Sequence, residues 1–227
     1  LIVLDPYAPP TYSVYSLNYA SLQVRAYAVT PEDWPAYLTY LRKAWEEEPP
    51  NPPGRQVLNR RVAVEAKADQ LAETVIDLTG LLTNGRGHLV LVIEPGESLI
   101  ASLRRGNYKP TIRVWIAATQ LALDVLQDDQ ELIAWVNALK DGAPLADVDL
   151  TLFPGGVKAT TGADGTARLP LPEIGDEDAV AYLVARKGDD AAFLPQATYV
   201  VRGGWRRAAT PDELRWYVWD DRQMYRP

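Results

Sequence analysis

Alternating apolar and polar positions recur along the chain and predict mainly β structure. In the segment Ser21–Val29, every second residue from Leu22 to Ala28 is apolar, and Gln23 and Arg25 fall between them. Because successive side chains of a strand point to opposite faces, this segment predicts a half-buried strand of an antiparallel sheet. The same reasoning predicts strands over Tyr12–Leu17, Gln56–Glu65, Leu71–Asp77, Gly87–Glu94 and Thr111–Ala118.

One segment of the first half has helical spacing and predicts an α-helix over residues 31–47. Thr30 precedes a proline and two acidic residues, an order typical of a helix N-terminus. The proline-rich run over residues 49–53 then ends the helix. We expect the helix to pack on one sheet through an apolar stripe formed by Trp34, Leu38, Leu41 and Trp45.

The second half carries almost no helix signal, and short strands follow one another with turn residues between them. Asp141–Gly142 and Asp164–Gly165 are predicted turn motifs, because Asp-Gly pairs suit the positive φ of hairpin turns. Six or seven strands in about a hundred residues is typical of an immunoglobulin-like sandwich. The expected strands are Leu121–Leu126, Glu131–Leu139, Ala146–Phe153, Thr166–Leu171, Ala179–Ala185 and Ala191–Leu194.

These patterns predict a mainly β fold of two consecutive immunoglobulin-like antiparallel β-sandwiches, the first with one inserted α-helix. Prolines at positions 6, 9 and 10 break the first apolar segment. Residues 1–10 are therefore expected to lead in from a preceding domain. The first sandwich is predicted over residues 11–118 and the second over 119–219. Residues 220–227 are expected to begin a further domain that continues past the end of the chain.

Composition excludes several classes of function. The 227 residues carry a net charge of −7, and the basic residues are scattered. Nucleic acid is not an expected partner, because phosphate contacts need a basic stripe. The chain has no cysteine, which excludes disulfides and thiolate chemistry. The longest apolar run, Leu89–Ile93, has the length of a strand and not that of a membrane span, so no membrane insertion is expected.

The sequence predicts no catalytic, cofactor-binding or metal-binding residue. His88 is the single histidine and precedes an apolar strand, so we interpret it as a strand-end residue rather than a catalytic base. No G-x-S-x-G elbow supports a Ser-His-Asp site. The acidic loops over 124–129, 176–178 and 189–190 lack the spacing of a calcium loop and are interpreted as solvated turns. Glu46–Glu48 is interpreted as a solvated charge run.

The seven tryptophans are predicted to fill cores and a domain junction rather than to bind a ligand. Trp115 and Trp135 lie in expected strands and are assigned to the sandwich cores. Trp205, Trp216 and Trp219 lie near the end of the chain, where a domain junction needs apolar side chains. An accessory domain that binds carbohydrate through these tryptophans stays open as an alternative.

The end of the chain resembles a phrase found in α2-macroglobulins. In that family a macroglobulin-like domain opens with D-R-x-x-Y-R/K-P-G-E, and Asp221, Arg222, Tyr225, Arg226 and Pro227 match its first part. The Gly-Glu that should follow is absent from the chain.

Two upstream segments are similar to the same family. The paired strands within Tyr12–Val29 resemble the start of an early macroglobulin-like domain in bacterial members. The two Asp-Gly turn motifs resemble phrases of the domain that precedes D-R-x-x-Y-R-P-G-E. Several families of exported immunoglobulin-like modules share those phrases.

The resemblance implies non-catalytic structural domains of a bacterial α2-macroglobulin, a protease-trapping endopeptidase inhibitor. It implies an exported protein, periplasmic or at the cell surface, with lipid anchoring through a segment before Leu1 as one form. Its expected partners are neighbouring domains of the same chain and, for the full-length protein, target proteases. No cofactor is implied. The family's thioester needs a cysteine, and this chain has none. The alternative is a set of immunoglobulin-like modules from an exported adhesion or cell-surface stalk protein.

Overall fold

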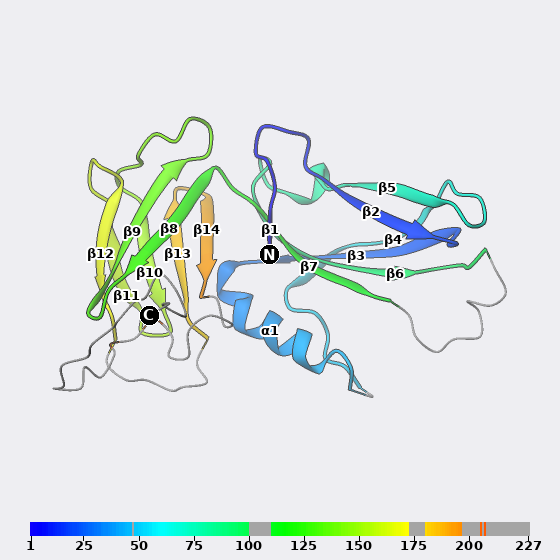
Figure 1. The fold of residues 1–227 in the computed structure, drawn as a ribbon, viewed down its shortest axis with the longest axis horizontal. Helices are drawn as coiled ribbons and strands as arrows, with labels where there is room; N and C mark the ends of the chain where they lie inside the picture. The colour runs from blue at the N-terminus through cyan, green and yellow to red at the C-terminus, as the bar shows by residue number, and fades with distance from the viewer. Residues whose placement is uncertain (47, 100–109, 173–179, 197–204, 206, 208–227) are drawn as a thin grey trace, which may run out of the picture.

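Two β-sandwiches lie side by side in the computed structural model, with helix α1 (Trp34–Lys43) beneath the point where they meet (Figure 1). The structure describes residues 1–46, 48–99, 110–172, 180–196, 205 and 207. Strand β7 ends at Ala118 and strand β8 begins at Leu121, so the chain passes from one sandwich to the other through Thr119 and Gln120.

The first sandwich has a five-stranded sheet facing a two-stranded one. The two-stranded sheet pairs β2 (Thr11–Leu17) with β5 (Leu71–Asp77). A short 3₁₀ helix, η2 (Thr79–Leu81), follows β5. The order in the larger sheet is β1 (Ile2–Val3), β7 (Ile112–Ala118), β6 (Gly87–Pro95), β3 (Ser21–Val29) and β4 (Arg55–Ala63).

The two-residue period of β3 and β6 fixes which side chains enter the first core. Val24 and Ala26 of β3 point toward β2 and β5, together with Leu89 and Leu91 of β6. The intervening residues of β6 are also buried, but they point to the opposite face of the sheet. The run Leu89–Ile93 is therefore continuously apolar because both faces of its strand are covered.

The second sandwich is built from a four-stranded and a three-stranded sheet. Its core contains Leu132 and Val136 from the smaller sheet and Leu150 and Leu183 from the larger one. Trp205, predicted to lie at a domain junction, belongs to this core instead. The larger sheet has the order β11 (Val157–Thr160), β10 (Asp149–Phe153), β13 (Tyr182–Lys187) and β14 (Asp190–Pro195), and the smaller has β12 (Thr166–Pro170), β9 (Glu131–Ala138) and β8 (Leu121–Gln127).

The mainly β, two-sandwich prediction is confirmed, and two details of it need correction. The predicted lead-in over residues 1–10 contains β1, which pairs with β7 at the edge of the first sheet and runs parallel to it. The sheets are therefore not wholly antiparallel. Strand β11 was not predicted, since its four residues are short and only half apolar.

The predicted helix over 31–47 is shorter in the structure. A 3₁₀ turn, η1 (Pro31–Asp33), leads into α1 (Trp34–Lys43). The backbone N–H of Thr30 donates to Asp33 Oδ2 at 2.8 Å, which fixes the start of the helix. The predicted end is too late, because none of residues 44–46 is buried and a short helix depends on packing for its stability.

Two tryptophans that were predicted to be packed are exposed in the structure: Trp45, expected on the helical stripe, and Trp135, expected in a sandwich core. Trp45 lies beyond α1 and is 72% exposed, with Arg113 Cζ 5.8 Å from its ring centroid. Trp135 is 36% exposed. It lies between the inward-facing Ala134 and Val136 of β9, so its side chain points to the outer face.

Candidate functional site: the junction between the sandwiches

An aromatic cluster fills the space between the two sandwiches. It is the third buried cluster of the molecule, separate from the two sandwich cores. The first sandwich and its helix contribute Trp34, Tyr37, Val90 and Trp115, among others, and the second contributes Phe193. The full buried set is Tyr27, Val29, Trp34, Tyr37, Tyr40, Val90, Val92, Trp115, Tyr182, Val184 and Phe193.

Phe193 of β14 is the side chain through which the second sandwich enters this cluster. Its ring centroid lies 5.1 Å from that of Trp34 and 5.4 Å from that of Trp115, in tilted and edge-to-face arrangements. Such geometries place the positive edge of one ring against the negative face of another and stabilise each pair by about 0.5–1.5 kcal/mol. The junction is therefore packed like a protein core.

His88 connects the two sandwiches through both of its ring nitrogens. Its Nδ1 accepts a hydrogen bond from Trp115 Nε1 at 3.2 Å, and its Nε2 lies 2.9 Å from the carbonyl oxygen of Ala191. An indole N–H can only donate and a carbonyl can only accept. His88 therefore holds its proton on Nε2 and is neutral. Burial lowers the pKa of His88 below its ordinary value of 6.5.

Polar groups of α1 and β7 fix the helix against the first sheet. Tyr37 Oη donates to the carbonyl oxygen of Arg113 at 3.2 Å, and Arg113 Nε donates to Tyr40 Oη at 3.1 Å. Burial raises the pKa of Tyr37 to about 12. The helix therefore presents Trp34 to the junction from a fixed position.

Ion pairs flank the apolar part of the junction. Arg186 of β13 pairs with Glu32 of η1 at 2.6 Å, and Arg86 pairs with Asp189 at 2.7 Å. Burial alone would raise the pKa of Glu32, but the hydrogen bond from Arg186 and other partners hold it below its ordinary value. Asp190 is buried and accepts the backbone N–H of Gln120 at 2.9 Å, so the prediction of a solvated turn at 189–190 is wrong for this residue. Polar contacts thus surround an aromatic centre.

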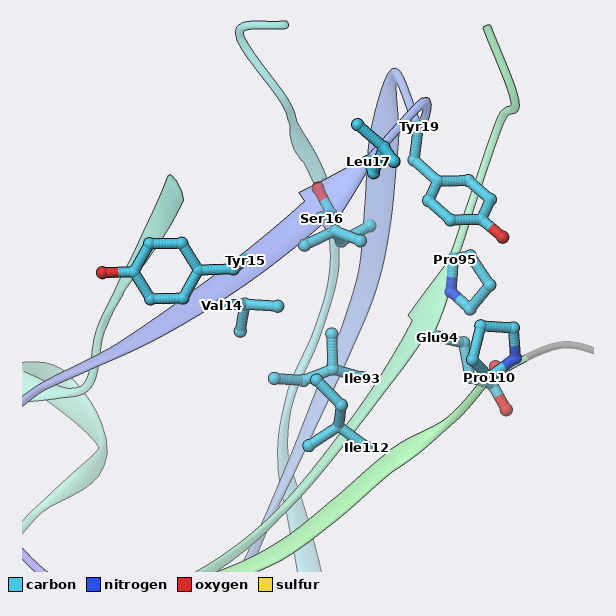
Figure 2. Close-up of a pocket in the computed structure, with 11 residues that line it drawn as sticks. Val14, Tyr15, Ser16, Leu17, Tyr19, Ile93, Glu94, Pro95, Pro110 and Ile112 are labelled. Atoms are coloured by element: carbon cyan, nitrogen blue, oxygen red, sulfur yellow. The ribbon is translucent and has the colours of Figure 1, made fainter. Parts of the chain in front are cut away.

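A pocket of about 240 Å³ opens at the far end of the first sandwich, between β2 and the ends of β6 and β7 (Figure 2). Val14, Ile93 and Ile112 point into it, whereas Tyr15 points away (Figure 2). Among its described lining residues the one carboxylate is that of Glu94, which pairs with Arg25 at 2.8 Å.

The two predicted Asp-Gly turn motifs lie in the second sandwich, away from the junction. Gly142 and Gly165 have φ of +73° and +75°. The Asp141 and Asp164 carboxylates accept the backbone N–H two residues on, each at 3.0 Å. Both motifs are therefore turns, as predicted. At Asp141–Gly142 the chain folds back on β9, with an antiparallel bridge between Asn137 and Pro144. At Asp164–Gly165 the expected hairpin does not form, because the flanking strands β11 and β12 belong to different sheets.

The terminal family motif, Asp221, Arg222, Tyr225, Arg226 and Pro227, lies outside the described residues, as do Trp216 and Trp219. The boundary at 219/220 lies there too. The part of the chain that the structure describes contains no group of three or more His, Cys, Asp or Glu side chains that could hold a metal ion. Over the same residues, no helix is long and apolar enough to cross a membrane.

Sequence reasoning missed this junction. Trp115, predicted to lie in a sandwich core, belongs to the junction cluster instead. Tyr27 shares the face of its strand that carries Gln23 and Arg25, a face that the alternation predicts to be polar, yet it is buried in the junction cluster. The one available signal was the continuous run Leu89–Ile93, which indicates burial on both faces of a strand.

Comparison with known proteins places this two-sandwich unit among known folds. No protein-family model matches the chain. The chain is 25% identical over 209 residues to circularly permutated Ras protein 2 of Dictyostelium discoideum, a match that covers 77% of this chain. The chain spans only 5% of the length of that relative.

Solved structures of alpha-2-macroglobulin from Escherichia coli have the same fold. The segment of that protein spanning domains NIE-MG1 is similar to this chain with a TM-score of 0.56 and 18% identity, over 81% of this chain and 87% of that one. The segment spanning MG0-NIE-MG1 has a TM-score of 0.56 and 18% identity, over 82% of this chain and 58% of that one. The native conformation seen by cryo-EM has a TM-score of 0.50 and 18% identity, over 81% of this chain and 11% of that one. The predicted resemblance to bacterial α2-macroglobulins is thus confirmed as a likeness of fold.

Proposed function

We propose that this chain is a non-catalytic, architectural pair of domains from a bacterial α2-macroglobulin, a protein that traps attacking proteases. The observation that carries the proposal is the likeness of fold over two consecutive domains, since the match extends across 87% of the NIE-MG1 segment of the E. coli protein. The rival proposal of an adhesion or stalk protein is therefore not favoured.

The domain names of the similar structure refine the assignment. We infer that the helix-bearing first sandwich is the counterpart of NIE and the second that of MG1, because the similarity covers 81% of this chain and 87% of that segment. The terminal phrase Asp221–Pro227 would then open the following macroglobulin-like domain. Neighbouring domains of the same chain are the partners that this arrangement implies.

The junction supports an architectural role. Trp34, Trp115 and Phe193 are buried between the sandwiches, so the two domains share a core instead of being joined by a linker alone. A domain array that closes around a protease needs segments that keep their internal geometry while others move. We propose that this pair is such a segment and has no inhibitory activity in isolation. We further propose that the parent protein is exported, to the periplasm or the cell surface.

The proposal is tested on the full-length protein that contains this segment, incubated with trypsin. Cleavage is expected to change its electrophoretic mobility. The bound trypsin should keep its activity on a small chromogenic substrate and lose most of its activity on a large protein substrate, because the trap excludes only large molecules. The isolated 227-residue chain is the control and should leave both activities unchanged. Full trypsin activity on the large substrate after cleavage would refute the protease-trapping function.

A further inference from the structure

We propose that the junction between the two sandwiches is an acid-sensitive contact, held closed by neutral His88 and opened when His88 takes up a second proton. This inference goes beyond the proposed function and is independent of it, because it depends only on the contacts around one side chain.

The first step of the argument is the hydrogen bonding of His88. The neutral ring accepts from Trp115 Nε1 through Nδ1 and donates to Ala191 through Nε2. In the imidazolium form both ring nitrogens are donors. No rotation of the ring can then supply an acceptor for the Trp115 N–H, which is buried and has no exposure to water. Protonation therefore leaves two N–H groups facing each other.

The second step is the surroundings of the ring. His88 is buried, with Trp115 at 6.0 Å and Phe193 at 5.7 Å between ring centroids. Trp115 belongs to the same sandwich as His88, whereas Ala191 and Phe193 belong to β14 of the second sandwich. The surface that separates His88 from water on this side is thus the second sandwich. Moving β14 away would hydrate an imidazolium without unfolding either core.

Charged groups face His88 from three elements. Arg186 of β13 disfavours the imidazolium, and Asp190 of β14 and Glu32 of η1 favour it. Glu32 is already paired with Arg186, and Asp190 accepts the Gln120 N–H, so neither carboxylate is directed at the ring alone. Burial outweighs these charges, and the pKa of His88 is lowered in the closed junction.

The sign of the pH effect follows from this lowered pKa. An opened junction exposes His88, whose pKa then returns toward 6.5. Between the two pKa values the open form binds more protons, so the closed form is favoured at higher pH. The equilibrium constant for opening should rise as pH falls below about 6.5, by up to tenfold per pH unit for one proton. Below the lowered pKa it should change no further.

The experiment measures the distance between the sandwiches in the 227-residue chain. The chain has no cysteine, so Ser13→Cys on β2 and Lys158→Cys on β11 introduce two exposed labelling sites, one in each sandwich. Fluorescence energy transfer between pH-insensitive dyes is followed from pH 8 to pH 4.5. We expect one narrow distance distribution at pH 8 and a second, longer population that grows below pH 6.5.

His88→Gln is the decisive variant, because glutamine can donate to Ala191 but does not titrate. It should show the same distance distribution throughout the pH range. Glu32→Gln is the matched control: it breaks the Arg186 ion pair and leaves His88 in place, so the growth of the open population below pH 6.5 should persist. An unchanged distribution in the parent chain, or equal opening in His88→Gln, would overturn the proposal.

A second measurement keeps the proposal testable if His88→Gln does not fold. His88 is the only histidine, so its imidazole proton signals in an NMR titration are unambiguous. A midpoint clearly below 6.5 that rises toward 6.5 in Phe193→Ala, where the junction is loosened, supports the proposal. A midpoint at or above 6.5 in the parent chain contradicts it.

Discussion

Replacing Trp34 and Phe193 by alanine should have non-additive effects on the free energy of unfolding, because the two side chains pack against each other across the junction. We consider Phe193→Ala, Trp34→Ala and the double variant in the 227-residue chain. Both side chains are buried and their ring centroids lie 5.1 Å apart, one from each sandwich. If the domains were merely adjacent, the two substitutions would act independently.

The expected magnitudes follow from burial and from ring geometry. Replacing a buried Phe or Trp by Ala removes about 3–5 kcal/mol of stability, because transfer and cavity terms add. The direct Trp34–Phe193 pair accounts for about 0.5–1.5 kcal/mol of each loss. The double variant should therefore be destabilised by less than the sum of the single variants, with the difference equal to this pair energy. Rings left around the cavity, such as Trp115, can enlarge the difference.

Urea denaturation followed by circular dichroism gives each free energy of unfolding from the midpoint and the slope. The control cycle pairs Phe193→Ala with Val24→Ala, since Val24 is buried in the first core and does not belong to the junction cluster. That cycle should be additive within about 0.3–0.5 kcal/mol. Additivity of the Trp34 and Phe193 substitutions within the same error would refute the shared interface.

Two further predictions concern local features. Gly142→Ala should cost about 1–2 kcal/mol for its positive φ alone, since a Cβ there meets nothing within 4 Å. Gly165→Ala should cost a further ~1–3 kcal/mol from overpacking, because its Cβ would lie 2.8 Å from Val136 O. Equal losses of stability in the two variants, measured by thermal denaturation, would contradict this. The raised pKa of Tyr37, about 12, means that its neutral form is favoured in the fold. Stability should therefore fall as pH rises above 10, and Tyr37→Phe should flatten that fall in urea titrations; a fall of unchanged size would contradict the assignment.

Most of the fold could be predicted because local patterns decide it. The alternation in Ser21–Val29 and Leu71–Asp77 assigns strands and inward faces correctly, and both strands have the predicted bounds. Pairing could not be predicted in the same way. Strand β2 comes directly before β3 in the chain, yet it pairs with β5. The turn at Asn18, which has a positive φ, leads from one sheet to the other. Which sheet a strand joins depends on the total surface buried, not on its own residues.

The junction was hidden from sequence reasoning for a related reason. The side chain of Tyr27 or Trp115 points away from the core of its own sandwich, but it is buried in the junction cluster of the two-sandwich unit. Periodicity reports the first property only. His88 illustrates the limit most clearly, since its partner Ala191 is 103 residues away and contributes a backbone carbonyl that no residue type reveals.

The balance of contacts at the junction decides how this segment can move. The ion pairs Arg186–Glu32 and Arg86–Asp189 have side chains that are 31–60% exposed, and such pairs contribute about 0–1 kcal/mol each. Salt weakens them further, but it does not weaken aromatic burial. The apolar centre therefore holds the junction, and Thr119 and Gln120 cannot act as a free hinge while Phe193 stays buried beside Trp34. While His88 is neutral and the junction is closed, a movement transmitted through this pair would displace both sandwiches together.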